Sequence, residues 1–143
     1  HDRLKLAKSL QIGMQKGETI QELRTRIVGF GDALRSPSRT LLIARTESGV
    51  IANTTRYLAA QDAADFWTWG TADDEIVRHS HATAEDETAR KPVRFGDTYT
   101  LRETRKGGVV QTAEMQFPQD PSAPAFAVVS CRCFQVVLPR KAA

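Results

Sequence analysis

The chain has 143 residues, of which 41% are hydrophobic and 26% charged, a composition that predicts one soluble globular domain. No stretch approaches the ~18 consecutive apolar residues of a membrane span, and no charged start leads into an apolar signal segment, so we expect no membrane partner. Lys and Arg total 20 against 17 acidic residues, and the resulting charge of +3 favours anionic partners without requiring them.

The first part of the chain has the residue spacing of helices. Apolar residues recur at helical intervals at Leu4, Ala7, Leu10 and Met14. Gly17 then predicts the end of this helix, and Thr19 with Glu22 has the spacing of a capping box, which predicts the start of a second helix ending near Gly29 and Gly31. Residues 1–36 are therefore expected to be N-terminal helices, which could form a helical linker from a larger protein.

A third and longest helix is predicted to begin at Ser36-Pro37, because proline at the first helical position loses no hydrogen bond. Its apolar face is traced by Leu41, Ala44, Ser48, Ile51, Thr55 and Leu58. A more polar stripe consists of Thr46, Gly49, Asn53 and Tyr57. Gly49 would allow another backbone to approach closely, so this stripe is expected to pack against something polar or functional.

After Asp62 the hydrophobic pattern changes to period two, which is typical of strands. Short strands are predicted at residues 66–69, 76–79, 93–95 and 98–101. The clearest pattern is a hairpin turn at 106–108 followed by an alternating strand over 109–117, and a proline-rich loop then leads to a final strand over 126–138. Helices followed by strands predict an α+β fold over 37–143, in which two or three N-terminal helices pack on a four- to five-stranded antiparallel sheet.

Two pairs of potential metal ligands have i, i+2 spacing, His79 with His81 and Cys131 with Cys133. Both pairs fall in predicted strands, so each pair would point to one face, and the four side chains could bind a tetrahedral zinc ion. A disulfide between such close cysteines is geometrically awkward, so reduced thiols are predicted. Neither pair has the usual zinc-knuckle spacing, so we assign no metal ligand and expect no cofactor; a zinc-stabilised binding module is the third hypothesis for the function.

A second group of residues could support catalysis. Histidine exchanges protons near neutral pH, so His81 could act as general acid or base while Arg45, Arg78 or Arg132 holds a phosphate, as a metal-independent ribonuclease requires. The competing interpretation is a solvated turn around Arg78 and a structural ion pair at Arg45. The sequence has no glycine-rich phosphate loop, no nucleophile elbow and no H-E-x-x-H pattern. Nucleotide hydrolysis, serine hydrolysis and metalloprotease chemistry are therefore not among the leading hypotheses.

Three segments occur in a specific order. They are Ile-Ala-Arg-Thr-Glu at 43–47 with Asn53 following, Thr71 to Arg78 followed by Ser80-His81, and Ser-Cys-Arg-Cys at 130–133. Together they resemble the phage Mu F-like head-morphogenesis family, in which A-R-T-E with a later Asn precedes a tryptophan strand, a T-x-x-D-x-x-V-R-x-S-H stretch and a closing N-C-R-C. The resemblance covers about residues 38–139. Ser130 stands where Asn is usual, and residues 82–86 lack the Leu-Asp-Gly that commonly follows the histidine.

The resemblance implies a minor capsid or head-morphogenesis protein that acts in head assembly or in DNA packaging or delivery near the portal. It implies phage portal or capsid proteins and nucleic acid as partners, and the virion and the bacterial cytoplasm as locations. The expected fold is also similar to the barnase, colicin and RelE-like ribonucleases and to the tips of bacterial polymorphic toxins. An endoribonuclease therefore remains the alternative, and such a toxin would have a cognate immunity protein.

Overall fold

The structure is a computed structural model in which residues 2–30 and 37–140 are described. The elements in chain order are α1 (Asp2–Gln15), α2 (Ile20–Val28), α3 (Pro37–Ala60), β1 (Ala64–Gly70), α4 (His79–Arg90), β2 (Val93–Arg94), β3 (Tyr99–Thr104), β4 (Val110–Met115), α5 (Ala125–Val128) and β5 (Phe134–Pro139). All strand pairs are antiparallel, which confirms the predicted α+β class. Among the described helices, none combines the length and hydropathy needed to cross a bilayer.

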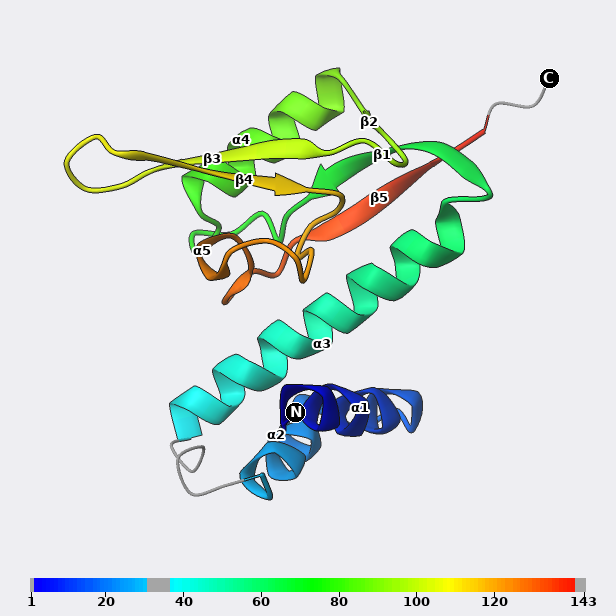
Figure 1. The fold of residues 1–143 in the computed structure, drawn as a ribbon, viewed down its shortest axis with the longest axis vertical. Helices are drawn as coiled ribbons and strands as arrows, with labels where there is room; N and C mark the ends of the chain where they lie inside the picture. The colour runs from blue at the N-terminus through cyan, green and yellow to red at the C-terminus, as the bar shows by residue number, and fades with distance from the viewer. Residues whose placement is uncertain (1, 31–36, 141–143) are drawn as a thin grey trace.

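Helix α3 lies between two hydrophobic cores. Figure 1 shows α1 and α2 on one side of α3 and the strands on the other. The smaller core is formed by Leu10, Leu23, Ile27 and Ala44, from α1, α2 and the first half of α3. Val50, six residues beyond Ala44 on the same helix, belongs instead to the larger core between α3 and the strands. One long helix therefore joins the helical pair to the sheets.

The predicted capping box at the start of α2 is present. The Thr19 backbone N–H donates to the Glu22 carboxylate at 2.6 Å, and the Glu22 N–H donates to the Thr19 hydroxyl at 3.3 Å. The hydrogen bonds from the backbone and side chain of Thr19 lower the pKa of the Glu22 carboxyl. This contribution to stability is therefore present above the ordinary pKa of a glutamate and is lost as the pH falls through the lowered value.

Replacing Thr19 by alanine is expected to lower the free energy of unfolding by about 1 kcal/mol, because the Glu22 N–H in the first turn of α2 loses the hydroxyl that accepts its hydrogen bond. Urea denaturation followed by circular dichroism measures this difference. Thr25→Ala is the matched control, because Thr25 lies inside the same helix, where its hydroxyl only donates back to the Gln21 carbonyl. Equal losses in the two variants would show that the cap does not stabilise α2.

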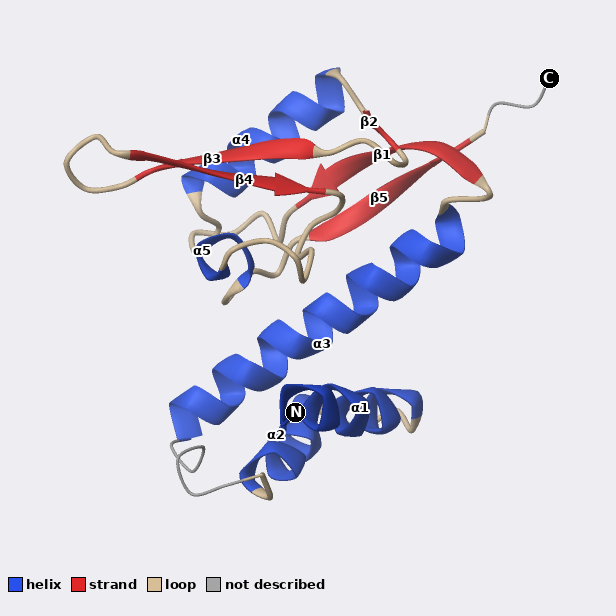
Figure 2. Cartoon of the chain, viewed as in Figure 1, coloured by secondary structure: helices blue, strands red, loops and turns tan. Residues whose placement is uncertain are grey.

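The strands form two sheets rather than the single sheet of four or five strands expected from the sequence. The first has the order β2-β1-β5, and the second is the β3-β4 hairpin (Figure 2). Strand β1 is central, with Trp67 opposite Val93 on one side and Val137 on the other. Trp67 and Trp69 share the inward face of β1 and are 0% and 2% exposed. They pack with Leu101 of β3, so the core lies between the two sheets.

One predicted strand is wrong, and another is confirmed only in its second half. Residues 76–79 form a turn and the start of α4, because the Asp74 carboxylate accepts the Ile76 N–H and closes the chain locally. The segment 126–138 was expected to be one strand, but it begins in α5 and its extended part starts only at Phe134. The proposed start of α3 at Ser36 and the end of α2 near Gly31 lie outside the described residues, and the helices are observed from Pro37 and up to Val28.

Candidate functional site

His81, Cys131 and Cys133 meet in the interior of the protein. The His81 Nδ1 atom lies 3.1 Å from the Cys133 Sγ and 3.4 Å from the Cys131 Sγ. The three side chains are only 2%, 5% and 5% exposed, and both cysteines are free thiols, as predicted. The three ligand-type atoms all lie within 4.8 Å of one another. This cluster, which we call the His-Cys-Cys cluster, joins the first turn of α4 to the loop before β5.

His79 does not take part in the cluster, which corrects the expected pairing of the two histidines. The prediction placed both on a strand, where residues two apart share a face, but they lie in α4, where such residues point about 200° apart. His79 is exposed. The His81 ring packs edge-on against Trp69, with ring centroids 5.5 Å apart, and within the described residues its Nε2 atom has no hydrogen-bond partner.

Two buried amides hold the backbone of the cysteine loop. Asn53 Nδ2 donates to the Cys133 carbonyl at 3.0 Å and to Gln119 Oε1 at 3.0 Å. Gln119 Nε2 donates in turn to the Cys131 carbonyl at 2.8 Å. Asn53 and Gln119 are 2% and 1% exposed. These two side chains, which we call the amide clamp, hydrogen-bond both cysteine carbonyls. Without such partners the buried carbonyls would destabilise the folded protein.

Gly49 makes room for the amide clamp. A Cβ atom at this position would lie 2.1 Å from Gln119 Oε1, well inside contact distance. The sequence predicted a close approach at Gly49, and the group that approaches is the Gln119 side chain rather than a backbone. Gln119 itself has a positive φ of 60° in the loop before α5, a conformation uncommon for residues other than glycine.

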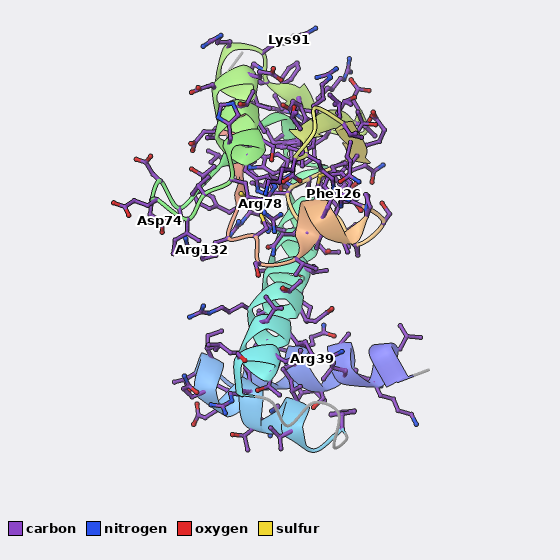
Figure 3. All side chains as sticks on the ribbon, turned by 90° about the vertical axis from the view of Figure 1, so that its left-hand side faces the viewer. Arg39, Asp74, Arg78, Lys91, Phe126 and Arg132 are labelled. Carbon is purple, nitrogen blue, oxygen red and sulfur yellow. The ribbon has the colours of Figure 1, made fainter. Side chains whose placement is uncertain are left out.

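Of the four residues expected to act in catalysis, His81 belongs to the cluster, and Arg78 and Arg132 lie beside it. Arg78 donates to the carbonyls of Phe126 and Val129, and Arg132 donates to the Asp74 carboxylate at 2.7 Å (Figure 3). Arg132 belongs to the cysteine loop itself, between Cys131 and Cys133, and Arg78 directly precedes α4. The Arg132 hydrogen bond lowers the pKa of the Asp74 carboxyl. Both guanidinium groups are thus used to hold loops together.

Arg45, the fourth expected residue, is exposed on α3 and lies outside the cluster. It lines a groove of about 260 Å³ together with Arg56 and Arg132. The next residue, Thr46, faces inward, where its hydroxyl accepts the Ser130 N–H at 3.2 Å. Successive residues of α3 therefore serve different surfaces, as the helical rotation of about 100° per residue requires.

The two thiols differ in acidity. A hydrogen bond from the Cys133 thiol lowers the pKa of Cys131, and the charges of Arg78 and Arg132 act in the same direction against burial. The pKa of Cys133 is raised, because its thiol is hydrogen-bonded to Cys131 and is buried, although His81 partly offsets this. The Cys133 N–H also donates to the Cys131 Sγ at 3.3 Å. Of the two thiols, Cys131 therefore has the lower pKa.

A small cavity of about 20 Å³ adjoins the cluster. Its walls are formed by Ala72, Ile76, Val77, Arg78, His81, Ser130, Cys131, Arg132 and Cys133. A cavity of about 10–15 Å³ is enough to hold one water molecule, so one solvent molecule can lie against the two sulfur atoms and the imidazole.

A family model described as phage Mu protein F like protein matches residues 4–136. The chain belongs to this family. The match extends over α1 and α2, which precede the region of the sequence resemblance, and it indicates a phage head-morphogenesis protein associated with the virion. No curated protein and no solved structure matches the chain.

The segments that carry the resemblance to the phage Mu F-like proteins converge in space. Asn53 comes from the first segment, His81 from the second, and Cys131 and Cys133 from the third. Sequence reasoning missed Gln119, the residue that links these segments through the amide clamp. The one signal for it was the glycine at position 49, which indicated that some group must approach α3 there.

Proposed function

We propose that this phage Mu F-like chain is part of a minor head protein that acts in head assembly or in DNA packaging and delivery near the portal. The family match over residues 4–136 carries this proposal, because it runs from the helical pair through β4 and into β5. Portal or capsid proteins of the same phage are the expected partners. The shared segments support a structural role, since their side chains fasten helix α3, helix α4 and the cysteine loop to one another.

The ribonuclease alternative requires His81 to exchange a proton with a bound substrate. The His81 side chain is 2% exposed, and its Nδ1 atom faces two thiols rather than solvent. Arg78 is engaged with two backbone carbonyls. Because a general acid or base must reach the reacting group at hydrogen-bond distance, this geometry favours the structural role over catalysis.

The groove beside α3 offers a contact for the DNA that a head protein would meet. It is lined by Arg45 and Arg56 together with Arg132, which is paired with Asp74, and none of its lining residues, all in the described part of the chain, is Asp or Glu. Guanidinium groups bind phosphate through paired donors, and such contacts position a protein without reading the sequence. We therefore include sequence-independent DNA contact at this groove in the proposed function.

Deletion of the encoding gene from its phage tests the role in the head. We expect fewer DNA-filled heads in electron micrographs of lysates, restoration by the wild-type gene, and the protein itself in purified particles by mass spectrometry. Normal numbers of filled heads together with absence of the protein from particles would overturn the proposal.

DNA contact and ribonuclease activity are measured on the purified chain. We expect the chain to bind duplex DNA with an affinity that falls as the salt concentration rises. An Arg45→Glu, Arg56→Glu variant should bind more weakly and with a smaller salt dependence, because each lost phosphate contact removes part of both. The control is Arg105→Glu, which changes an exposed charge in the distant β3-β4 turn. Cleavage of RNA in EDTA that requires His81 would instead favour the ribonuclease.

A further inference from the structure

We propose that His81 Nδ1, Cys131 Sγ and Cys133 Sγ bind one zinc ion, with a water molecule in the adjoining cavity as the fourth ligand. This site differs from the four-residue arrangement considered from the sequence, because His79 is excluded and solvent takes its place. The inference concerns the architecture of the chain and does not depend on its role in the phage head.

The spacing of the three atoms fits a tetrahedral zinc ion. Zinc–sulfur and zinc–nitrogen bonds of about 2.3 and 2.05 Å at the tetrahedral angle put nitrogen and sulfur about 3.6 Å apart. The observed separations of Nδ1 from the two Sγ atoms are 3.1 and 3.4 Å. The two Sγ atoms lie within 4.8 Å of each other, so small adjustments of the side chains would bring all three atoms to bonding distance around one ion.

The donor set favours zinc over calcium and magnesium. Two thiolates with one imidazole are typical ligands of zinc, whereas calcium and magnesium require oxygen ligands. Two thiolates also neutralise the charge of a divalent ion, which a buried site requires. Since no residue lining the cavity, all of them within the described chain, is Asp or Glu, water remains as the fourth ligand.

The surrounding hydrogen bonds hold the ligands where the ion would bind. The amide clamp fixes the carbonyl of each cysteine, and the Cys133 N–H donates to the Cys131 sulfur and helps to hold it in place. With Nδ1 on the metal, the ring proton of His81 lies on Nε2, which has no acceptor among the described residues, and the imidazole is oriented by its edge-on packing against Trp69. Outer groups that orient ligands in this way typically change metal affinity 10–100-fold when they are removed, so Asn53 is expected to act as a positioning residue.

A bound ion would crosslink two segments that are distant in the sequence. His81 and Cys131 are 50 residues apart, at the first turn of α4 and in the loop before β5. Because zinc ligands are not preassembled in an unfolded chain, binding would stabilise the folded protein.

The proposal is tested by titrating zinc into the untagged, fully reduced protein from which metal has first been removed with a chelator. We expect one equivalent of Zn²⁺ to bind in competition with a chromophoric chelator, with release of protons and a higher melting temperature. Co²⁺ in place of Zn²⁺ is expected to give a thiolate-to-cobalt charge-transfer band and the strong visible bands of a tetrahedral site. This spectrum identifies the ligands in the wild-type protein, so it remains informative if a variant fails to fold.

Three variants distinguish residues that bind or position the zinc ion from a nearby residue that does neither. Cys133→Ser is expected to lower zinc affinity by more than about 100-fold, and Asn53→Ala by about 10–100-fold. His79→Ala is the matched control, because His79 lies two residues from His81 on the opposite, exposed side of α4, and it should retain full affinity. The proposal is overturned if the folded, reduced wild type takes up no stoichiometric zinc, if Co²⁺ shows no thiolate band, or if His79→Ala loses as much affinity as Cys133→Ser.

Discussion

Trp67→Ala is expected to lower the free energy of unfolding by about 3–5 kcal/mol, the usual range for removing a large buried aromatic side chain. Trp67 is 0% exposed and lies at the middle of the central strand β1. Its ring packs with that of Trp69, with centroids 6.4 Å apart. The substitution therefore opens a cavity between the two sheets, where the surrounding strands cannot close together. Urea denaturation at constant m-value measures the loss.

Phe66→Ala provides the matched control for this prediction. Phe66 is the preceding residue of β1, points to the opposite face of the sheet, and is 44% exposed. We expect its replacement to cost about 1 kcal/mol or less, because much of its apolar area already contacts water. Similar losses for the two variants would contradict the assignment of the core to the face of β1 that carries the tryptophans.

Gly49→Ala is expected to destabilise the protein by about 2–3 kcal/mol, although the same change in an exposed helix stabilises by roughly 0.5–1 kcal/mol. The added Cβ would lie 2.1 Å from Gln119 Oε1, so Gln119 must move and give up its hydrogen bonds to Asn53 and to the Cys131 carbonyl. Whether the substitution lowers or raises the free energy of unfolding therefore shows whether Gln119 is displaced. Thermal and urea denaturation of the variant measure it.

A double-mutant cycle isolates the contact between Gly49 and Gln119. In a Gln119→Ala background the Gly49→Ala change should be neutral or stabilising, because the side chain that it displaces is gone. Gly29→Ala is the control, since Gly29 has a negative φ and its nearest atom to a new Cβ is 3.4 Å away. Additive effects at positions 49 and 119 would show that the amide clamp does not depend on the glycine.

Local chemistry explains which elements could be predicted. The start of α2 followed from Thr19 and Glu22, because both halves of a capping box lie within one turn. The hairpin of β3 and β4 followed from a glycine turn and an alternating strand, and Gly107 and Gly108 do adopt positive φ angles of 94° and 80°. In each case the residues that decide the structure are neighbours in the sequence.

Helix α4 was missed because its buried face is not made of large apolar residues. The buried side chains are Ser80, His81, Ala84 and Thr88. They have helical spacing but no hydrophobic stripe, and Thr88 contributes through a hydrogen bond that its hydroxyl accepts from the Trp69 N–H at 2.8 Å. Hydrophobic periodicity cannot detect a face that packs through small residues and hydrogen bonds.

The candidate site was predicted in part. Cys131, Cys133 and His81 were recognised as potential ligands, and Arg78 and Arg132 do lie beside them. The pairing of His79 with His81 was wrong because it depended on a strand that is a helix. Gln119 was not recognised, since its role arises from contacts with residues 66 positions earlier and 12 positions later in the chain.

The sequence by itself determined the α+β class, most helix and strand positions, and the resemblance to the phage Mu F-like proteins, because these depend on local periodicity and on ordered motifs. Only the tertiary structure decided that the strands divide into two sheets and that His81, rather than His79, meets the two cysteines. Both outcomes depend on the packing of α3, α4 and the cysteine loop, whose contacts join residues 50 to 84 positions apart. Such long-range pairings are set by complementary shape and buried hydrogen bonds, which no local pattern of residues encodes.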